Sequence, residues 1–502
     1  MRLHDIIDRL EAAGLEPVLT GGDNRNFEID QLASDSRRVG PDGLFVAIRG
    51  TSVDGHLFID KAVTNGAIAI VHEAMPADLA IVGDMPSGIA SVHVDNSAGA
   101  YGIIASALNG DPSASVGCIG ITGTNGKTTT SFLLWSLFEL IGERCGLIGT
   151  IEYRSGRETL PSTHTTPDAA ALHSLLAQMR DAGCSRCAME VSSHALVQER
   201  VAGVNFRCAA FTNLTQDHLD YHGTMDAYLA AKKRLFDGLS ADACAVTNLD
   251  DPAGRQIVGG TDAVITTYGR HADADIRFEI LDNTINGLRL KLDGSEIRTR
   301  LVGDFNAYNL AASYAVAVSL GVDPARARGA LSEASPVPGR FERIDVGRGA
   351  VAIVDYAHTP DALENVLKTA AALRDAVASE RGSIVCVFGC GGDRDRTKRP
   401  LMGAIAERYA DRVLVTNDNP RTEDPAQIFD DIRRGMNRPE DADWITDRAR
   451  AIRSAVETSR AGDIIIVAGK GHETYQINGT EKIHFDDREV VRSAASGRTD
   501  TA

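Results

Sequence analysis

A glycine-rich segment, GITGTNGKTTT at residues 120–130, has the residue types that hold the phosphates of a nucleotide. An apolar run typical of a strand precedes it and a stretch of helical periodicity follows, so backbone N–H groups and a helix N-terminus can cradle phosphates. Lys127 is spaced to reach the β- and γ-phosphates, and the Thr128 hydroxyl to face Mg²⁺. Ile121 stands where GxxxxGK[ST] has glycine, so the loop closes from Gly123 instead. We expect nucleotide binding rather than a glycine turn with an incidental lysine.

Polar side chains also follow other apolar runs that predict strands. Glu190 ends CAMEV, Asp355 ends AIVD, and the segment NDNPRTEDP at residues 417–425 follows RVLVT. Ligands of doubly wound folds bind at the carboxyl ends of such strands. Glu190 is well placed for Mg²⁺, which prefers hard oxygen ligands. Asp355 could instead cap the helix after Pro360, and the 417–425 segment could be only a turn into a helix.

The elements that must position these residues alternate as strand, loop and helix, which predicts an α/β fold with mostly parallel sheets. The stretch 276–302 instead alternates in polarity around Asn-Gly and Asp-Gly, which predicts antiparallel hairpins. A chain of 502 residues is long enough for about three domains. We predict boundaries that give domains at 1–112, 113–340 and 341–502.

Charge and composition exclude some partners. The net charge of -17 argues against nucleic acid or an anionic membrane surface. No stretch approaches the roughly 18 apolar residues of a membrane span, and the N-terminus lacks the apolar core of a signal peptide. We therefore expect a cytoplasmic protein with small-molecule substrates, and a monomer.

The eight cysteines are scattered, as in proteins of a reducing compartment. Cys184 and Cys187 form a CxxC pair, but two further ligands at similar spacing are missing. We expect buried structural thiols rather than a metal or redox site.

Ten blocks in order, from TGTNGKTTT onward, resemble the Mur ligase family of ATP-dependent amide-bond synthetases. The later blocks are EVSSHALVQER, TNLTQDHLDYHG, YLAAKKRLF, GDFNAYNLAAS, PVPGRFE, DYAHTPD, FGCGGDRD, DNPRTEDP and AGKGHE. The resemblance covers most of the chain from about residue 34 to 473. It implies three domains: a UDP-sugar-binding α/β domain, a central P-loop ATPase, and a C-terminal Rossmann-like domain that binds an amino acid.

The blocks are most similar to those of members that add the third residue of the peptidoglycan stem peptide. Such a member activates a carboxylate of UDP-N-acetylmuramoyl-L-alanyl-D-glutamate as an acyl phosphate, which an amine then attacks. The resemblance implies a catalytic set of Lys127, Glu190, His218 and Lys232, with Thr128 and the last three at a site for two Mg²⁺ ions. It implies that CO₂ carbamylates Lys232, giving a carboxylate that binds metal. Lys233 is better explained as a solvated helix lysine.

Binding residues carry over block by block. ATP contacts are implied for Gly123, Thr124, Asn125, Gly126, Lys127, Thr128, Thr129, Asn309, Arg340 and Asp355. UDP-sugar-peptide contacts are implied for Ser36, Thr165, Thr166, Ser192, Gln198 and Arg200. Amino-acid contacts are implied for Arg394, Asp418, Asn419, Pro420, Arg421, Gly469 and Glu473. A C-terminal contact to ATP implies closure of the domains around the substrates.

The resemblance makes DNPR the amino-acid selector. Members that add meso-diaminopimelate carry it, and lysine-adding members lack the arginine. Arg421 can pair with the second carboxylate of diaminopimelate, which lysine does not have. The alternatives are a same-family ligase that adds L-lysine or another amino acid, a folylpolyglutamate-type synthetase, a P-loop kinase or NTPase, and a non-catalytic nucleotide-binding module.

Overall fold

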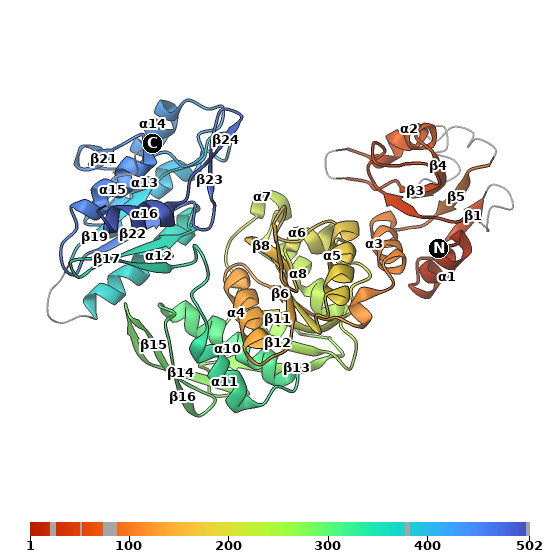
Figure 1. The fold of residues 1–502 in the computed structure, drawn as a ribbon, viewed down its shortest axis with the longest axis horizontal. Helices are drawn as coiled ribbons and strands as arrows, with labels where there is room; N and C mark the ends of the chain where they lie inside the picture. The colour runs from red at the N-terminus through yellow and green to blue at the C-terminus, as the bar shows by residue number, and fades with distance from the viewer. Residues whose placement is uncertain (21–26, 51–52, 74–87, 377–381, 498–502) are drawn as a thin grey trace. The chain divides into compact units, whose positions relative to one another are not determined.

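The computed structural model describes residues 1–20, 27–50, 53–73, 88–376 and 382–497. The chain forms two compact units: Met1–Arg277 with Asn309–Ala330, and Phe278–Tyr308 with Leu331–Ala502. Three sheets with flanking helices follow one another along the chain (Figure 1). The α/β prediction is confirmed, whereas the domain boundaries at 112 and 340 stay predictions.

The first unit begins with a five-stranded sheet. Its strands, in sheet order, are β1 (Val18–Thr20), β5 (Ala90–His93), β4 (Ala67–His72), β3 (Gly43–Val46) and β2 (Gln31–Ala33). One face packs on α1 (Leu3–Ala12) and α3 (Ser97–Leu108), and the other on α2 (Ile59–Thr64). Both faces are buried because parallel strands need cover on each side, which explains the continuous apolar runs in this part of the sequence.

The second sheet of this unit holds the phosphate loop. Nine of its eleven strands are, in sheet order, β14 (Ile276–Thr284), β13 (Val264–Gly269), β12 (Cys244–Asn248), β11 (Phe206–Phe211), β6 (Gly117–Thr122), β10 (Arg186–Glu190), β7 (Cys145–Ile148), β8 (Glu152–Ser155) and β9 (Glu158–Pro161). The strands from β14 to β7 pair in parallel where they meet in this unit. Their carboxyl ends therefore share one edge, at which β11, β6, β10 and β7 are consecutive neighbours.

Eight helices accompany the strands of this sheet along the described chain. They are α4 (Lys127–Leu140), α5 (Ala169–Asp181), α6 (Ser193–Val197), α7 (Leu219–His222), α8 (Met225–Asp237), α9 (Gly254–Ile257), α10 (Asp304–Ser319) and α11 (Pro324–Glu333). Short 3-10 turns occur at Gly55–Phe58, Pro112–Ala114 and Pro439–Asp441. Leu172, Leu176 and Met179 of α5 are fully buried against the sheet. Spacings of three and four put them on one helix face.

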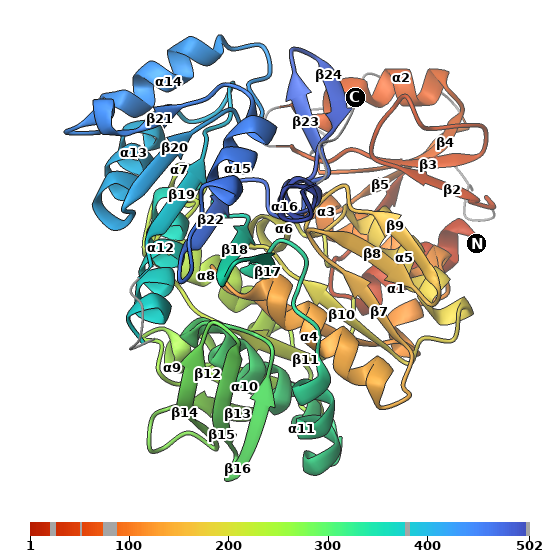
Figure 2. The ribbon, with the colours of Figure 1, turned by 60° about the vertical axis from the view of Figure 1, so that its left-hand side comes forward.

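The second unit contains a six-stranded sheet between two helix layers (Figure 2). Its strands, in sheet order, are β17 (Glu342–Gly347), β18 (Ala350–Asp355), β22 (Ile464–Ala468), β19 (Ile384–Phe388), β20 (Arg412–Val415) and β21 (Asp443–Trp444). The helices are α12 (Pro360–Asp375), α13 (Lys398–Tyr409), α14 (Pro425–Arg433), α15 (Arg448–Glu457) and α16 (Asp487–Ala495). Alternate strand residues pack on α12–α14 on one face and on α15 and α16 on the other.

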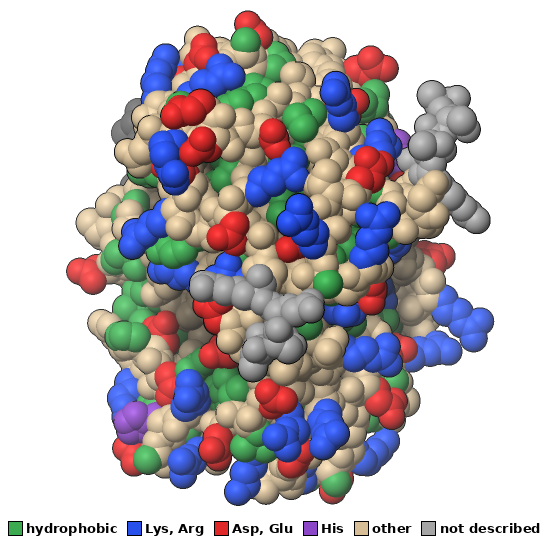
Figure 3. Space-filling model, turned by 90° about the vertical axis from the view of Figure 1, so that its left-hand side faces the viewer, with side chains coloured by type: hydrophobic (Ala, Val, Ile, Leu, Met, Phe, Trp, Pro, Cys, Tyr) green, Lys and Arg blue, Asp and Glu red, His purple; other side chains and the backbone are tan. Residues whose placement is uncertain are grey.

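Hairpins complete the second unit. The predicted antiparallel segment is confirmed, since β14 pairs with β15 (Gly287–Leu292) and β15 with β16 (Ser295–Thr299). A separate hairpin joins β23 (Tyr475–Asn478) to β24 (Glu481–His484). Among the described residues, no helix combines the length and apolar character needed to cross a membrane. On the face drawn in Figure 3, basic and acidic side chains are interspersed.

The cysteines match the prediction of structural thiols. Seven of the eight are buried, none is in a disulfide, and burial raises the pKa of Cys184 and Cys187. No group of three or more His, Cys, Asp or Glu side chains suited to a metal ion occurs in the described part of the chain.

Candidate active site

The phosphate loop, residues 123–126, is held in place by the segment that follows β11. Thr124 N donates to Asn213 O at 2.8 Å, and Asn125 N donates to Asn213 Oδ1 at 2.9 Å. Thr212 Oγ1 donates to Asn125 O at 2.6 Å. Since β6 and β11 are neighbouring parallel strands, these contacts keep the loop open at the sheet edge, where its N–H groups and α4 can face an anion.

Two loop glycines have backbone conformations that other residues rarely adopt. Gly123 has a φ of +145°, and a Cβ there would lie 1.9 Å from Thr212 Oγ1. Gly126 has a φ of +87°, and a Cβ there would lie 2.5 Å from Asn309 Oδ1. Asn309, which also accepts from Thr130 Oγ1 at 3.4 Å, is thus brought to the loop from α10. Both glycines are needed because loop and neighbour approach more closely than a side chain permits.

Glu190 lies at the end of β10, beside the loop, and is 1 % exposed. Its Oε2 accepts from Thr128 Oγ1 at 2.9 Å and from Thr150 Oγ1 at 3.2 Å, while Oε1 accepts from Thr150 N at 2.7 Å. A carboxylate and a threonine hydroxyl therefore meet where the phosphates of a nucleotide would end. These hard oxygen ligands suit Mg²⁺, which keeps several waters and takes few protein ligands.

Two lysines share one carbonyl of the loop. Lys127 Nζ and Lys232 Nζ each donate to Gly123 O at 2.9 Å, and Lys127 also donates to Thr124 O at 2.8 Å. Lys232 is 1 % exposed, and its burial, with the charge of Lys127, holds its pKa well below the usual value. Lys233 is less buried and pairs with Asp237. The buried site therefore favours the neutral amine at residue 232, the form that can add CO₂, whereas Lys233 lies outside it in an ion pair.

His218 belongs to an aromatic cluster with His194, Tyr221, His222 and Tyr228. The His218 and His194 ring centroids are 4.7 Å apart, and His222 lies 5.0 Å from Tyr228. Burial lowers the pKa of His194 to about 4 and also lowers that of His218. His218 occupies the N-cap position of α7 without a side-chain capping bond. The lowered pKa favours the neutral ring, in which one nitrogen has a lone pair that can bind a metal ion.

The residues predicted for the peptide end of the nucleotide sugar cluster beyond Glu190. Thr166 Oγ1 donates to Glu190 O at 2.8 Å and accepts from Ser192 N at 3.1 Å. Arg200 donates to Thr166 O at 2.9 Å and to Gln198 Oε1 at 2.7 Å. Thr165 Oγ1 lies 3.0 Å from Thr150 Oγ1. Ser36, in contrast, lies after β2, where its carbonyl accepts from Asn65. Thr129 is buried in the first turn of α4.

Arg340 and Asp355 come together within the second unit. Asp355 accepts from Phe341 N at 2.7 Å and from Ala357 N at 2.8 Å. Burial raises the pKa of Asp355, and Arg340 opposes the rise. Arg340 also lies 4.7 Å over the ring of Tyr356. The helix after Pro360 is capped by Thr359, so the interpretation of Asp355 as its cap is wrong.

The DNPR segment follows β20 and faces the loop after β22. Asn419 Nδ2 donates to Glu473 Oε2 at 3.1 Å, and the fully buried Lys470 donates to Asn419 Oδ1 at 3.1 Å and to Glu473 Oε2 at 2.9 Å. Asn419 Oδ1 also accepts from Ile477 N at 3.0 Å. A Cβ on Gly469 would lie 2.7 Å from Asp418 Oδ2. The two blocks therefore form one polar site.

Arg421 has a left-handed backbone, with a φ of 53°. Its NH1 donates to Gly392 O at 2.9 Å, and its N–H donates to Ile477 O at 3.1 Å. A point at the Cβ position of Gly391 lies 3.1 Å from Arg421 NH1 and 3.7 Å from Arg394 Cγ. The two arginines predicted to bind the amino acid are thus neighbours. Helix α14 is capped by Asp424, so helix entry does not account for DNPR.

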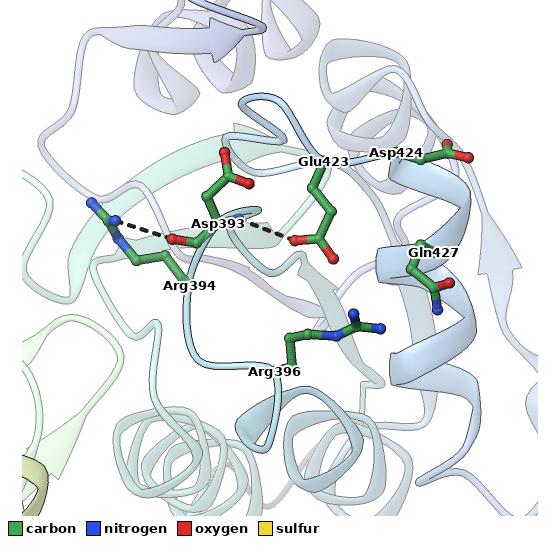
Figure 4. Close-up of a pocket in the computed structure, with 6 residues that line it drawn as sticks. All are labelled: Asp393, Arg394, Arg396, Glu423, Asp424 and Gln427. Atoms are coloured by element: carbon green, nitrogen blue, oxygen red, sulfur yellow. Dashed lines mark hydrogen bonds between the residues drawn. The ribbon is translucent and has the colours of Figure 1, made fainter.

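A hollow of about 580 Å³ lies beside this site, lined by Asp393, Arg394, Arg396, Glu423, Asp424 and Gln427. Arg394 lies on one side of Asp393, and Arg396, Glu423 and Gln427 on the other (Figure 4). Glu423 accepts from Asp393 N at 3.0 Å and from the buried Arg399 at 2.6 Å. Arg399 also donates to Gly391 O at 3.1 Å, which joins the 391–394 loop to DNPR.

Sequence reasoning missed several residues of these sites. Thr150 lies two residues past the end of β7, so its place at the carboxyl edge was a usable signal. Lys470 lies inside AGKGHE, but its burial against Asn419 depends on tertiary contacts. The partners of the loop at Thr212 and Asn213, and the aromatic neighbours of His218, gave no signal at the level of spacing.

Comparison with known families gives matches along most of the chain. Residues 28–101 match the Mur ligase family catalytic domain, residues 121–317 the Mur ligase middle domain, and residues 339–471 the Mur ligase glutamate ligase domain. The chain belongs to the Mur ligase family. The phosphate loop and Glu190 fall within the matched middle domain of this Mur ligase, and the DNPR segment falls within its matched glutamate ligase domain.

Curated relatives agree over their full length. The UDP-N-acetylmuramoyl-L-alanyl-D-glutamate--2,6-diaminopimelate ligase of Parabacteroides distasonis is 46% identical over 498 residues, covering 99% of each chain. The ligase of the same name from Geobacillus thermodenitrificans is 43% identical, covering 99% of this chain and 100% of its own.

Solved structures agree on the fold. A structure of a UDP-N-acetylmuramoyl-L-alanyl-D-glutamate--2,6-diaminopimelate ligase has a TM-score of 0.70 at 32% identity, covering 99% of each chain. The MurF ligase of Thermotoga maritima, solved with ADP, has a TM-score of 0.57 at 19% identity, covering 87% of this chain and 93% of its own, a likeness of fold. The three-domain architecture of the family is thereby confirmed.

Proposed function

We infer that this chain is an ATP-dependent ligase that joins meso-diaminopimelate to UDP-N-acetylmuramoyl-L-alanyl-D-glutamate in peptidoglycan precursor synthesis. The main support is the full-length similarity to ligases of that name. The hydrogen bond between Thr128, which follows the phosphate loop, and Glu190 agrees with it. We propose that residues 1–112 hold the UDP-sugar, 113–340 hold ATP, and 341–502 hold the amino acid. We further propose a monomer that acts in the cytoplasm.

The chemistry needs positioning and charge neutralisation. A carboxylate oxygen of the D-glutamyl residue attacks the γ-phosphorus and ADP leaves, which forms an acyl phosphate. The amine of diaminopimelate then attacks the acyl carbon, phosphate leaves, and the amine loses its proton. Lys127, the loop N–H groups and the start of α4 face the transferred phosphoryl group. Thr166, Ser192, Gln198 and Arg200 hold the peptide end beside Glu190.

We propose that Thr128, Glu190 and His218 hold Mg²⁺, with Lys232 as its carbamate. The hydrogen bond of 2.9 Å between Thr128 and Glu190 supports the fit, because both oxygens are already directed to one point. Bound Mg²⁺ neutralises negative charge that builds up on the phosphates. The lowered pKa of Lys232 supports carbamylation, since only a neutral amine adds to CO₂. Asn309, Arg340 and Asp355 are proposed ATP contacts.

We propose that Arg421, with Arg394, pairs with the carboxylate at the far end of diaminopimelate. Asp418, Asn419 and Glu473 would orient an ammonium group, Pro420 would stiffen the turn, and Gly469 would allow the close approach of Asp418. Bound lysine would leave the arginine without its partner. A site built to pair a polar group can discriminate against an analogue that lacks it by a kcat/KM ratio of ~10⁴ or more.

Phosphate release by purified protein tests this function, with ATP, Mg²⁺ and UDP-N-acetylmuramoyl-L-alanyl-D-glutamate. Separate reactions would contain meso-diaminopimelate, L-lysine or no amino acid, and mass spectrometry would identify the product. Release only with diaminopimelate is expected. Equal use of lysine would keep the ligase and remove Arg421 as selector. Turnover without an acceptor would favour an NTPase, and binding without turnover a non-catalytic module.

A further inference from the structure

A buried arginine lies beneath the proposed amino-acid site. Arg448, the first residue of α15, has a fully buried side chain. Its Nε donates to Asp487 Oδ1 and its NH2 to Asp487 Oδ2, each at 2.7 Å. Asp487, the first residue of α16, is also fully buried. The two-point pair fixes the plane of the guanidinium, which a lysine ammonium cannot reproduce.

The remaining donors of Arg448 bind two backbone carbonyls. NH2 donates to Ala468 O at 3.0 Å, and NH1 lies 3.4 Å from Asn417 O. Ala468 directly precedes Gly469, and Asn417 directly precedes Asp418. Ala468 is the last residue of β22 and Asn417 lies two residues past the end of β20, and β19 separates these two strands in the sheet. Two strand spacings amount to about 10 Å, so one planar group ties together loops that the sheet itself does not join.

The same arginine faces the carboxylates of the site. The Cβ position of Gly469 lies 2.7 Å from Asp418 Oδ2 and 3.8 Å from Arg448 NH2. Burial lowers the pKa of Arg448, but Asp487, and then Asp418 and Glu473, raise it overall. A permanent positive charge therefore lies under Asp418.

We propose that Arg448, held by Asp487, is a positioning residue for the amino-acid substrate: it sets the spacing of the Asp418–Arg421 and Gly469–Glu473 segments. This rests on the proposed function, because the substrate is the amino acid of that reaction. Arg448 acts through the two loops and contacts no reacting atom. The residues that Arg448 contacts, Asp487, Ala468 and Asn417, are not among the proposed contacts of ATP or the nucleotide sugar.

Arg448→Lys and Asp487→Asn test the proposal in the full-length enzyme. The KM for meso-diaminopimelate should rise by ~10- to 100-fold, because a displacement of about 1 Å at a reacting group can cost ~10²-fold. The KM values for ATP and the nucleotide sugar should change by less than about threefold, because the two loops that Arg448 holds do not carry the proposed contacts of these substrates. Arg412→Lys is the matched control, since Arg412 begins β20 and pairs with Asp443 at 2.7 Å, at the opposite end of the strand.

Each outcome decides the proposal. A selective rise in the amino-acid KM, absent from the control, supports it. Unchanged KM values, or an equal loss in every parameter, overturn it. If one variant does not fold, as judged by circular dichroism, the other decides; if neither folds, the pair serves stability and the proposal fails. If the wild type uses a different amino acid, the proposed function fails, yet the same comparison can be made with that amino acid.

Discussion

Arg421 can be removed without disturbing its backbone, because its φ of 53° is one that asparagine tolerates. Arg421→Asn therefore deletes the guanidinium alone. Arg421→Ala deletes the same group but keeps the left-handed strain of about 1 kcal/mol that arginine already has and that asparagine largely avoids. Both lose the bond from NH1 to Gly392 O. We expect the alanine variant to have the lower melting temperature and the two variants to have the same defect toward substrate.

The size of that defect follows from a charge left unpaired. Removing one partner of a buried pair costs about 3 kcal/mol or more, and Arg421 is half-buried, so we take the lower figure. At about 1.36 kcal/mol per tenfold, kcat/KM for meso-diaminopimelate should fall ~150-fold. The kcat/KM for L-lysine should stay equal or rise, since lysine lacks the carboxylate that Arg421 would pair with.

Steady-state phosphate release with each amino acid measures both values, and the KM for ATP is the internal control. An Arg421→Asn enzyme with unchanged kcat/KM for meso-diaminopimelate would refute the reasoning. So would a loss of equal size for both amino acids, because a general defect does not discriminate between them.

Three further predictions concern the phosphate site. Glu190→Gln should lower kcat/KM by ~10³-fold without lowering the melting temperature. The glutamine amide can keep the contacts of Glu190 to Thr128 and Thr150, but it loses the charge. A clear drop in melting temperature would contradict this prediction. The lowered pKa of Lys232 means that, between its folded-state pKa and the pKa of a free lysine, the unfolded chain binds more protons than the folded chain. The free energy of unfolding should therefore rise with pH in that window, by at most about 1.4 kcal/mol per pH unit. In CO₂-free buffer, urea titrations from pH 7 to 10 should therefore show the stability advantage of Lys232→Met shrinking as pH rises; a constant difference would indicate a charged Lys232. Gly123→Ala should abolish ATP binding measured by calorimetry, because the new Cβ would lie 1.9 Å from Thr212 Oγ1. Gly142→Ala is the control: φ is also positive at Gly142, but no atom of the described residues lies close to the Cβ position, so this variant should bind ATP normally.

The sequence by itself determined the features that depend on neighbours along the chain. The phosphate loop between strand and helix, Glu190 at the end of its strand, and the hairpins of 276–302 follow from local spacing, and the structure has each of them. Parallel strands also place their carboxyl ends at one edge, so the position of Glu190 beside the strand that leads into the phosphate loop could be anticipated from topology alone.

Only the tertiary structure decided which side chains are buried and what they contact. Lys232 and Lys233 are adjacent in the sequence, yet Lys232 is buried with a lowered pKa and Lys233 is a partly exposed lysine in an ion pair, because successive helix positions point about 100° apart. Lys470 is a polar residue whose spacing does not indicate that its side chain is buried. Arg448 lies 30 residues beyond Asp418 and reaches it only because α15 packs against the sheet between them. Contacts of this kind join segments far apart in the chain, and pattern within a segment does not encode them.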